Sequence, residues 1–317
     1  MLLLHKKDKN LRKKIITILF SLFLLISLSA GYQNAYAGAN VPSLVETQWL
    51  ADNLKNPDMR IVYVGGFSPK SMADFGGKHI PGSVYVSSNS VMKILGNGST
   101  PPDKAGFEAL MGRLGIKNDT HVVIYGSGAN PLISTVFWLM EYFDHEKISY
   151  LNGGIAKWTQ EKHKTATGAP AQITAAKYTA VRDESIRADA DYVLQNLKNP
   201  KDILVDTRGL DVYKGTRNEV PSNKRTGHIP GAVNLNFYST NLKNDGTFKS
   251  AKDLKAVYEA KGVTKDKEAI TYCQGGVRAA HTYFVLKHLL GYPKVRNYVG
   301  SWGEWANLDA AKYPIEK

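Results

Sequence analysis

The chain has 317 residues, a formal net charge of +13, eight histidines and a single cysteine. This length suffices for two ordinary domains. One cysteine excludes a disulfide within the chain, and the histidines show no ligand spacing, so neither a disulfide scaffold nor a metal site is expected.

The first 37 residues have the pattern of a secretory signal peptide. Six basic residues precede an apolar core at 15–28, and Ala35-Tyr36-Ala37 fits the small-x-small cleavage pattern. The alternative is an uncleaved membrane anchor, but the core is shorter than the roughly 20 residues that span a bilayer. We therefore expect an exported protein, periplasmic or secreted, that begins at Gly38 and has no stable membrane insertion after cleavage.

Removing the six basic residues and one aspartate lowers the formal charge from +13 to +8. Beyond the signal there is no basic run with interleaved aromatic residues, so most of this charge is expected to be solvated surface. A moderate positive charge suits a small anionic substrate, and no nucleic-acid partner is expected.

The remaining chain repeats itself in three blocks that occur in the same order in both halves. The matched blocks are 77–84 with 226–233, 121–125 with 268–272, and 150–158 with 298–305. Three blocks in one order indicate a tandem duplication. His79 and His228 each precede Ile-Pro-Gly, and we predict that they hold turns rather than exchange protons.

Each half alternates short apolar runs with helical patterns, which is typical of an α/β fold whose mostly parallel sheet is covered by helices on both faces. The segment 161–184 is rich in Ala, Thr and Lys and is predicted to be a linker, with an additional helix as the alternative. It separates an N-terminal domain at 41–160 from a C-terminal domain at 185–317. In the second half, strands are expected at 202–206, 232–235, 269–272 and 295–298, and helices at 251–261 and 279–290.

Cys273 lies where the chain passes from a predicted strand to a predicted helix, next to a Gly-rich stretch. Backbone N–H groups and the positive end of the helix dipole at such a turn favour the thiolate, which is the nucleophilic form. The alternative is a buried cysteine that only fills space. In the first half Gly126 takes the position of Cys273, and Ser127 lies one residue too late to replace it. We therefore predict that Cys273 is catalytic and that the N-terminal half is inactive.

Taken together, the repeated blocks, the Cys273 loop and the closing segment 300–305 resemble the tandem-domain rhodanese family of sulfurtransferases, of the thiosulfate or 3-mercaptopyruvate type. The resemblance covers residues 41–315 and implies two rhodanese-like domains with catalysis in the second and no cofactor. It implies that Cys273 takes a sulfur atom from a small anionic donor as a persulfide and passes it to a thiol or cyanide. The implied site consists of Cys273, the loop backbone of Gln274, Gly275, Gly276 and Val277 around the sulfur, Arg208, Lys214 and Arg278 for the donor, and Asp206 to orient the loop.

The spacing from Cys273 to Arg278 bears on the choice of chemistry. Rhodanese-fold phosphatases and arsenate reductases resemble this fold but have Cys-x5-Arg, and the shorter Cys-x4-Arg found here fits a sulfur atom better than a phosphate. Lys214 stands where mercaptopyruvate-type members often have arginine, and the loop lacks their hydroxyl residues. Thiosulfate is therefore the predicted donor, with 3-mercaptopyruvate or a non-enzymatic persulfide carrier as alternatives.

Two of the predicted donor-binding residues have structural alternatives. An ordinary ion pair with Asp206 or Glu219 is the alternative for Arg208. For Arg278 the alternative is that it merely caps the loop.

Overall fold

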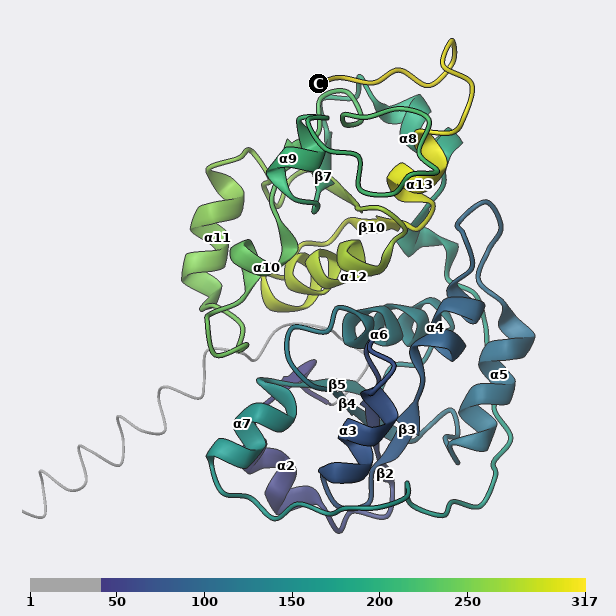
Figure 1. Cartoon of the computed structure of the whole chain (residues 1–317), viewed down its shortest axis with the longest axis vertical. Helices are drawn as coiled ribbons and strands as arrows, with labels where there is room; N and C mark the ends of the chain where they lie inside the picture. Colours follow the sequence, from purple (N-terminus) through teal and green to yellow (C-terminus); the bar gives the residue numbers. More distant parts are fainter. Residues whose placement is uncertain (1–40) are drawn as a thin grey trace, which may run out of the picture. The chain divides into compact units, whose positions relative to one another are not determined.

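The computed structural model describes residues 41–317 (Figure 1). The predicted signal peptide and its cleavage site lie outside these residues. In the described part of the chain, no helix combines the length and hydropathy that a membrane span needs.

The first half forms a five-stranded sheet with the strand order β1-β5-β4-β2-β3, and every neighbouring pair is parallel. Its strands are β1 (Leu44–Val45), β2 (Met59–Val64), β3 (Val84–Val86), β4 (His121–Tyr125) and β5 (Ile148–Leu151). Its helices are α2 (Thr47–Asn53), α3 (Ser71–Gly77), α4 (Ser88–Leu95), α5 (Lys104–Arg113), α6 (Leu132–Tyr142) and α7 (Gly154–Gln160).

The second half forms a second five-stranded parallel sheet with the order β6-β10-β9-β7-β8, which is the first sheet's order repeated strand for strand. The structure therefore confirms the predicted α/β fold and the tandem repeat. Its strands are β6 (Arg187–Ala188), β7 (Asp202–Asp206), β8 (Val233–Asn234), β9 (Glu268–Tyr272) and β10 (Val295–Tyr298). Its helical segments are η2 (Glu184–Ile186), α8 (Ala190–Asn196), α9 (Leu210–Tyr213), α10 (Phe237–Asn241), α11 (Ala251–Glu259), α12 (Val277–Phe284), the π-helical turn η3 (Val285–Leu289) and α13 (Ser301–Trp305).

In the second half, one predicted strand was too long and one predicted helix began too late. The strand expected at 232–235 has only two residues, because the N–H of Ala232 donates to the Ile229 carbonyl in the preceding turn (3.1 Å) and not to a neighbouring strand. The helix expected from 279 begins two residues earlier, at Val277, since Gly276 turns the chain directly into it.

Side chains of β2 alternate between two hydrophobic clusters, as they must when a strand is buried on both faces. Ile61 and Tyr63 pack with Leu50 of α2 and Phe75 of α3 on one side of the sheet. On the other side, Val62 and Val64 pack with residues of α4, α5 and α6. Helices therefore cover both faces of the first sheet, and the second sheet is covered in the same way by α8 and α13 on one face and by α11 and α12 on the other.

The two halves meet along α6 and α12, which lie side by side (Figure 1) and share one hydrophobic cluster. At the edge of this contact Glu141 accepts from Lys287 (2.6 Å) and from His288 (3.0 Å). A second contact involves Gly98, where an added Cβ would fall on the backbone of Gly300. The first half is thereby packed directly against the segment that follows β10.

Each of the two His-Ile-Pro-Gly turns is hydrogen-bonded to the tyrosine at the end of a strand, and in the second half this strand leads into the Cys273 loop. The N–H of Ile229 donates to the hydroxyl of Tyr272, the last residue of β9 (3.1 Å), and Ile80 makes the equivalent bond to Tyr125 (2.9 Å). In the second half His228 stacks on Tyr213, and its Nδ1 lies 3.0 Å from the Tyr213 carbonyl. The histidine thus serves the turn, as predicted.

Residues 161–183 form neither a helix nor a strand longer than a single bridge. The segment runs along the first half, where Ala166 pairs with His79 and the N–H of Ala176 donates to the Gly112 carbonyl (2.9 Å). Its hydrogen bonds hold it to the surface of one domain, so its path is fixed by contacts with that domain. The predicted linker at 161–184 and the domain boundaries on either side of it stay predictions.

Candidate active site

Cys273 follows the last residue of β9 and begins a short loop that ends in α12. Parallel sheets place such loops at the carboxyl edge, where functional sites of α/β proteins form. Gly276, the residue before the helix, has φ +77°, and a Cβ there would lie 2.9 Å from the Val299 backbone. Only glycine fits this turn, which directs the helix N-terminus toward the loop. Cys273 itself is 1% exposed.

Ser301 holds this loop in place, a role that was not among the sequence predictions. Its Oγ accepts from the N–H of Cys273 (3.0 Å) and from the N–H of Gly276 (3.0 Å), and it donates to the Tyr298 carbonyl (2.7 Å). Ser301 is fully buried and has φ +52°, a conformation that costs a non-glycine residue about 1 kcal/mol or more. The hydroxyl's three hydrogen bonds offset this cost.

The first half shows what the same backbone looks like without a thiol. The N–H of Ile155 donates to the Gly126 carbonyl (3.1 Å), just as the N–H of Trp302 donates to the Cys273 carbonyl (3.0 Å). Gly126 and Cys273 therefore occupy equivalent positions, as the sequence alignment predicted. The position equivalent to Ser301 is Gly154, with φ +54°. Where there is no Cys loop to bind, glycine takes the left-handed position.

Loop N–H groups divide into two sets. The N–H of Gly276, predicted to face the sulfur, donates to Ser301 instead, because the turn at this glycine points it toward the buried hydroxyl. Among the described residues, the N–H groups of Gln274, Gly275, Val277 and Arg278 have no backbone or side-chain acceptor. The latter two belong to the first turn of α12, where helical N–H groups normally lack an intrahelical partner. These four groups are free to bind negative charge.

Arg278 lies beside the loop and forms a two-pronged ion pair with Glu219. Its Nη1 is 2.8 Å from Oε1 and its Nη2 is 2.9 Å from Oε2, and both side chains are 21% exposed. Burial alone would lower the pKa of Arg278, but the neighbouring Cys273 and Glu219 raise it above its ordinary value. The guanidinium therefore stays charged next to the sulfur.

Arg208 is placed differently from Arg278, because it is fully buried. Its Nε and Nη2 donate to the Asp206 carboxylate (Nη2 to Oδ2 2.6 Å), and Nη2 also donates to the Gly227 carbonyl (2.7 Å). The guanidinium stacks 4.6 Å from the Trp302 ring. This geometry favours the ion-pair alternative for Arg208, and it shows the Asp206 carboxylate directed at Arg208 and not at the loop. The residue that contacts the β9 end is Thr207, whose Oγ1 donates to the Tyr272 carbonyl (3.1 Å).

Lys214 lies exposed at the end of α9. No hydrogen bond or ion pair ties it to the Cys273 loop within residues 41–317. Its predicted role in binding the donor has no contact to support it, and it stays a prediction.

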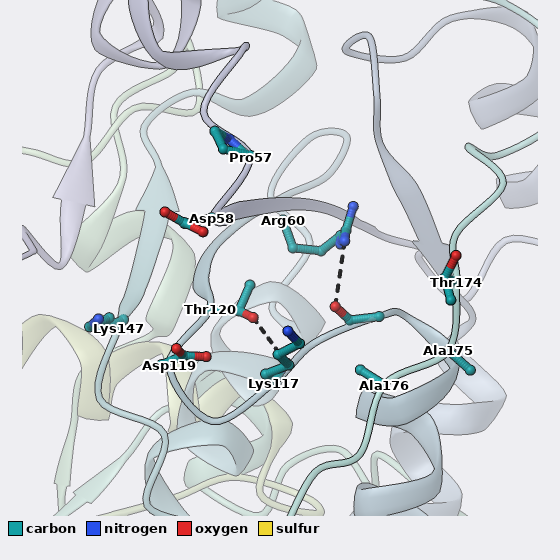
Figure 2. Close-up of a pocket in the computed structure, with 11 residues that line it drawn as sticks. Pro57, Asp58, Arg60, Lys117, Asp119, Thr120, Lys147, Thr174, Ala175 and Ala176 are labelled. Carbon is teal, nitrogen blue, oxygen red and sulfur yellow. Dashed lines mark hydrogen bonds between the residues drawn. The ribbon is translucent and has the colours of Figure 1, made fainter.

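A separate cavity of about 490 Å³ lies in the first half, and no residue of the Cys273 loop lines it (Figure 2). It is lined by residues at the amino ends of β2 and β4, including Asp58, Arg60 and Thr120. Arg60, labelled in Figure 2, donates from its Nη2 to the Gly115 carbonyl (3.4 Å). Functional loops of parallel sheets lie at the carboxyl ends of the strands, as Cys273 does in its sheet, whereas this cavity lies at the amino ends.

Across the described residues, no group of three His, Cys, Asp or Glu side chains is placed to hold a metal ion.

Fold and site together define a class of protein: two tandem α/β domains, the second of which presents a thiol at a strand-to-helix turn. Residues 46–161 and 189–308 each match the family model for the rhodanese-like domain. The chain belongs to the rhodanese family, as its motifs predicted, and it is a sulfurtransferase.

Relatives of similar length bear this out. The "Sulfur carrier protein TtuD" of Thermus thermophilus is 38% identical over 274 residues, which cover 84% of this chain and 94% of that protein. The "Thiosulfate sulfurtransferase" of Bos taurus is 35% identical over 281 residues, covering 83% and 91%. The crystal structure of the 3-mercaptopyruvate sulfotransferase SseA from Escherichia coli matches with a TM-score of 0.71 and 26% identity, covering 83% of this chain and 99% of that chain.

Proposed function

We propose that this protein is an exported thiosulfate sulfurtransferase that works through a persulfide on Cys273. The observation that supports it most is that the chain's one thiol lies beside Arg278, in a loop with four N–H groups that have no acceptor in the described structure. The equivalent loop of the first half, built on Gly126, has the backbone without the thiol.

The reaction has two steps. The Cys273 thiolate attacks the outer sulfur of thiosulfate, the new S–S bond forms, and the old S–S bond breaks with its electron pair leaving on sulfite. This yields Cys–S–S⁻ and SO₃²⁻ from Cys–S⁻ and S₂O₃²⁻, so atoms and charge balance. Cyanide or a thiolate then attacks the terminal sulfur, which restores the thiolate and releases thiocyanate or a persulfide.

The loop stabilises charge at the point where it appears. The terminal sulfur of the persulfide is anionic, and N–H groups of Gln274, Gly275 and Val277 can donate to it as they would to an oxyanion. Arg278 offers a planar fork to the oxygens of the donor, a geometry that suits a sulfonate-like group. Several relatives carry the name thiosulfate sulfurtransferase, which favours this donor.

Thiocyanate formation tests this proposal. With thiosulfate and cyanide, the wild-type protein should release thiocyanate and sulfite in equal amounts, and Cys273→Ser should release neither. Running 3-mercaptopyruvate in parallel compares the alternative donor, and a clearly higher kcat/KM for it would overturn the choice of thiosulfate. Release of thiocyanate by Cys273→Ser would overturn the role of the thiol.

A second candidate is a sulfur carrier that receives its sulfur from another protein, and the 38% identity to a protein named sulfur carrier favours it. A carrier would hold a persulfide on Cys273 yet turn over small donors at a negligible rate. Comparing the yield of persulfide with the rate of thiocyanate release separates the two.

Export is proposed from the sequence of residues 1–37. If it is correct, the protein recovered from the cell envelope or medium begins at Gly38, and N-terminal sequencing checks this. Recovery of the intact N-terminus in the cytosol would contradict it.

A further inference from the structure

The segment 218–224 crosses the Cys273 loop as a strap, fixed firmly at both ends. Before it, Arg217 pairs with Asp211 (Nε to Oδ2 2.5 Å), and its N–H donates to the Asp211 carbonyl. After it, Arg225 donates to four carbonyls of the C-terminal segment: those of Trp305, Ala306, Leu308 and Tyr313. Most of the strap between these anchors is exposed or half-buried.

Two side-chain pairs hold the strap onto the loop. The Glu219 carboxylate takes both Nη groups of Arg278, at 2.8 and 2.9 Å. Asn223 and Gln274 exchange amide hydrogen bonds in both directions, at 2.8 and 3.2 Å. In the part of the chain that the structure describes, no other hydrogen bond or ion pair joins residues 218–223 to the loop.

Cys273 is 1% exposed, and the strap is bound to Gln274 and Arg278 of its loop. A donor that binds both Nη groups of Arg278 must therefore part Glu219 from it. The Arg278 guanidinium, which would bind an anionic donor through two N–H groups, already binds the Glu219 carboxylate in the same bidentate way. The Glu219 charge also repels any incoming anion.

We propose that Glu219 acts as a built-in competitor that an anionic sulfur donor must displace from Arg278 to reach Cys273. This inference rests on the proposed function for the nature of the donor. Displacement opens the strap, and the departure of the anionic product lets Glu219 return to Arg278 and cover the sulfur again. Glu219 is thus a specificity-determining residue. An anion that binds Arg278 more weakly than Glu219 does cannot displace it and does not reach Cys273.

Alkylation of the chain's one cysteine tests the competition without requiring turnover. The rate with anionic iodoacetate is divided by the rate with neutral iodoacetamide, so any change in thiol reactivity or strap opening cancels in the ratio. For Glu219→Gln we expect this ratio to rise about tenfold, the factor for losing one partly exposed charge-assisted contact. Glu219→Asp should stay near the wild-type ratio.

Glu259→Gln is the matched control, because it removes the same charge from an exposed ion pair, with Lys255 on α11, that does not belong to the strap. It should change the ratio by less than about twofold. An unchanged ratio in Glu219→Gln, or an equal rise in Glu259→Gln, would overturn the proposal.

Thiosulfate kinetics then separate this inference from the proposed function. If both are right, Glu219→Gln lowers the KM for thiosulfate about three- to tenfold, with a smaller change in kcat. If the alkylation ratio rises but neither wild type nor Glu219→Gln forms thiocyanate, the competition between Glu219 and anions is supported and thiosulfate is rejected as the donor. A raised ratio with an unchanged KM for an active enzyme overturns the displacement of Glu219 by thiosulfate.

Discussion

Replacing Ser301 by alanine removes one oxygen atom on which the geometry of the Cys273 loop depends. The hydroxyl accepts two N–H groups, those of Cys273 and Gly276, and both residues are buried. A buried donor left without an acceptor costs about 1–3 kcal/mol, so the variant should lose roughly 2–6 kcal/mol of unfolding free energy, less where the loop relaxes. Because the loop presents the thiol, kcat for thiosulfate should fall at least about tenfold.

Glycine at the same position makes the test sharper. Ser301 has φ +52°, and relieving that strain is worth about 1–2 kcal/mol. The flexibility of glycine in the unfolded chain takes back about 0.5–1 kcal/mol. Ser301→Gly should therefore be more stable than Ser301→Ala by up to about 1.5 kcal/mol, the reverse of the usual order, although both lose the hydroxyl.

Denaturant unfolding of the three proteins measures these differences, with Ser185→Ala, at an exposed serine, as the control expected to stay within about 0.5 kcal/mol. The reasoning would be refuted if Ser301→Ala were as stable as wild type, or if alanine were better tolerated than glycine. Equal activity in wild type and both variants would refute the role of the hydroxyl in positioning the loop.

Three further predictions concern the rest of the fold. Arg208→Met leaves the buried Asp206 carboxylate unpaired and should cost about 3–5 kcal/mol in denaturant unfolding, whereas a stable variant with only a raised donor KM would restore the donor-binding role. Gly98→Ala places a Cβ on the backbone of the second half and should both destabilise the protein and lower kcat; Gly128→Ala, also at positive φ but in open space, should cost only about 1 kcal/mol, and equal effects of the two would contradict a contact between the halves. Burial alone would raise the pKa of Glu141, but the adjacent histidine and lysine hold it at about 2. The ionised Glu141 side chain therefore stabilises the fold fully above its ordinary pKa of 4.5, and this contribution is lost as the pH falls toward 2. In acid titrations, the wild-type protein should lose its stability advantage over Glu141→Gln across that pH range. A difference in stability that stays constant would contradict this.

The sequence was most informative where the chain repeats. That the second half repeats the fold of the first, and that Gly126 and Cys273 are equivalent, follow from three blocks occurring twice, because each block marks the same part of one fold unit. The roles of His79 and His228 could be predicted for the same reason.

Interactions between residues far apart in the chain could not be predicted in this way. The environment of Arg208 depends on burial, which no local pattern reveals, and the sequence left open whether its guanidinium meets a donor or Asp206. The strap pairs Glu219 with Arg278 and Asn223 with Gln274 across more than 50 residues, and neither Glu219 nor Asn223 belongs to a repeated block. Ser301 did leave a signal, a serine opposite Gly154 in the last repeated block, and only the left-handed φ shared by both residues makes its meaning clear.

The most direct test of the central claim is the intact mass of the protein after incubation with thiosulfate and removal of the excess. Because the chain has one cysteine, a gain of one sulfur atom identifies a persulfide on Cys273. We predict this gain in the wild-type protein, its loss on adding cyanide as thiocyanate appears, and no gain in Cys273→Ser. A wild-type protein that gains no sulfur, or a Cys273→Ser variant that gains as much as wild type, would contradict a sulfur transfer carried by Cys273.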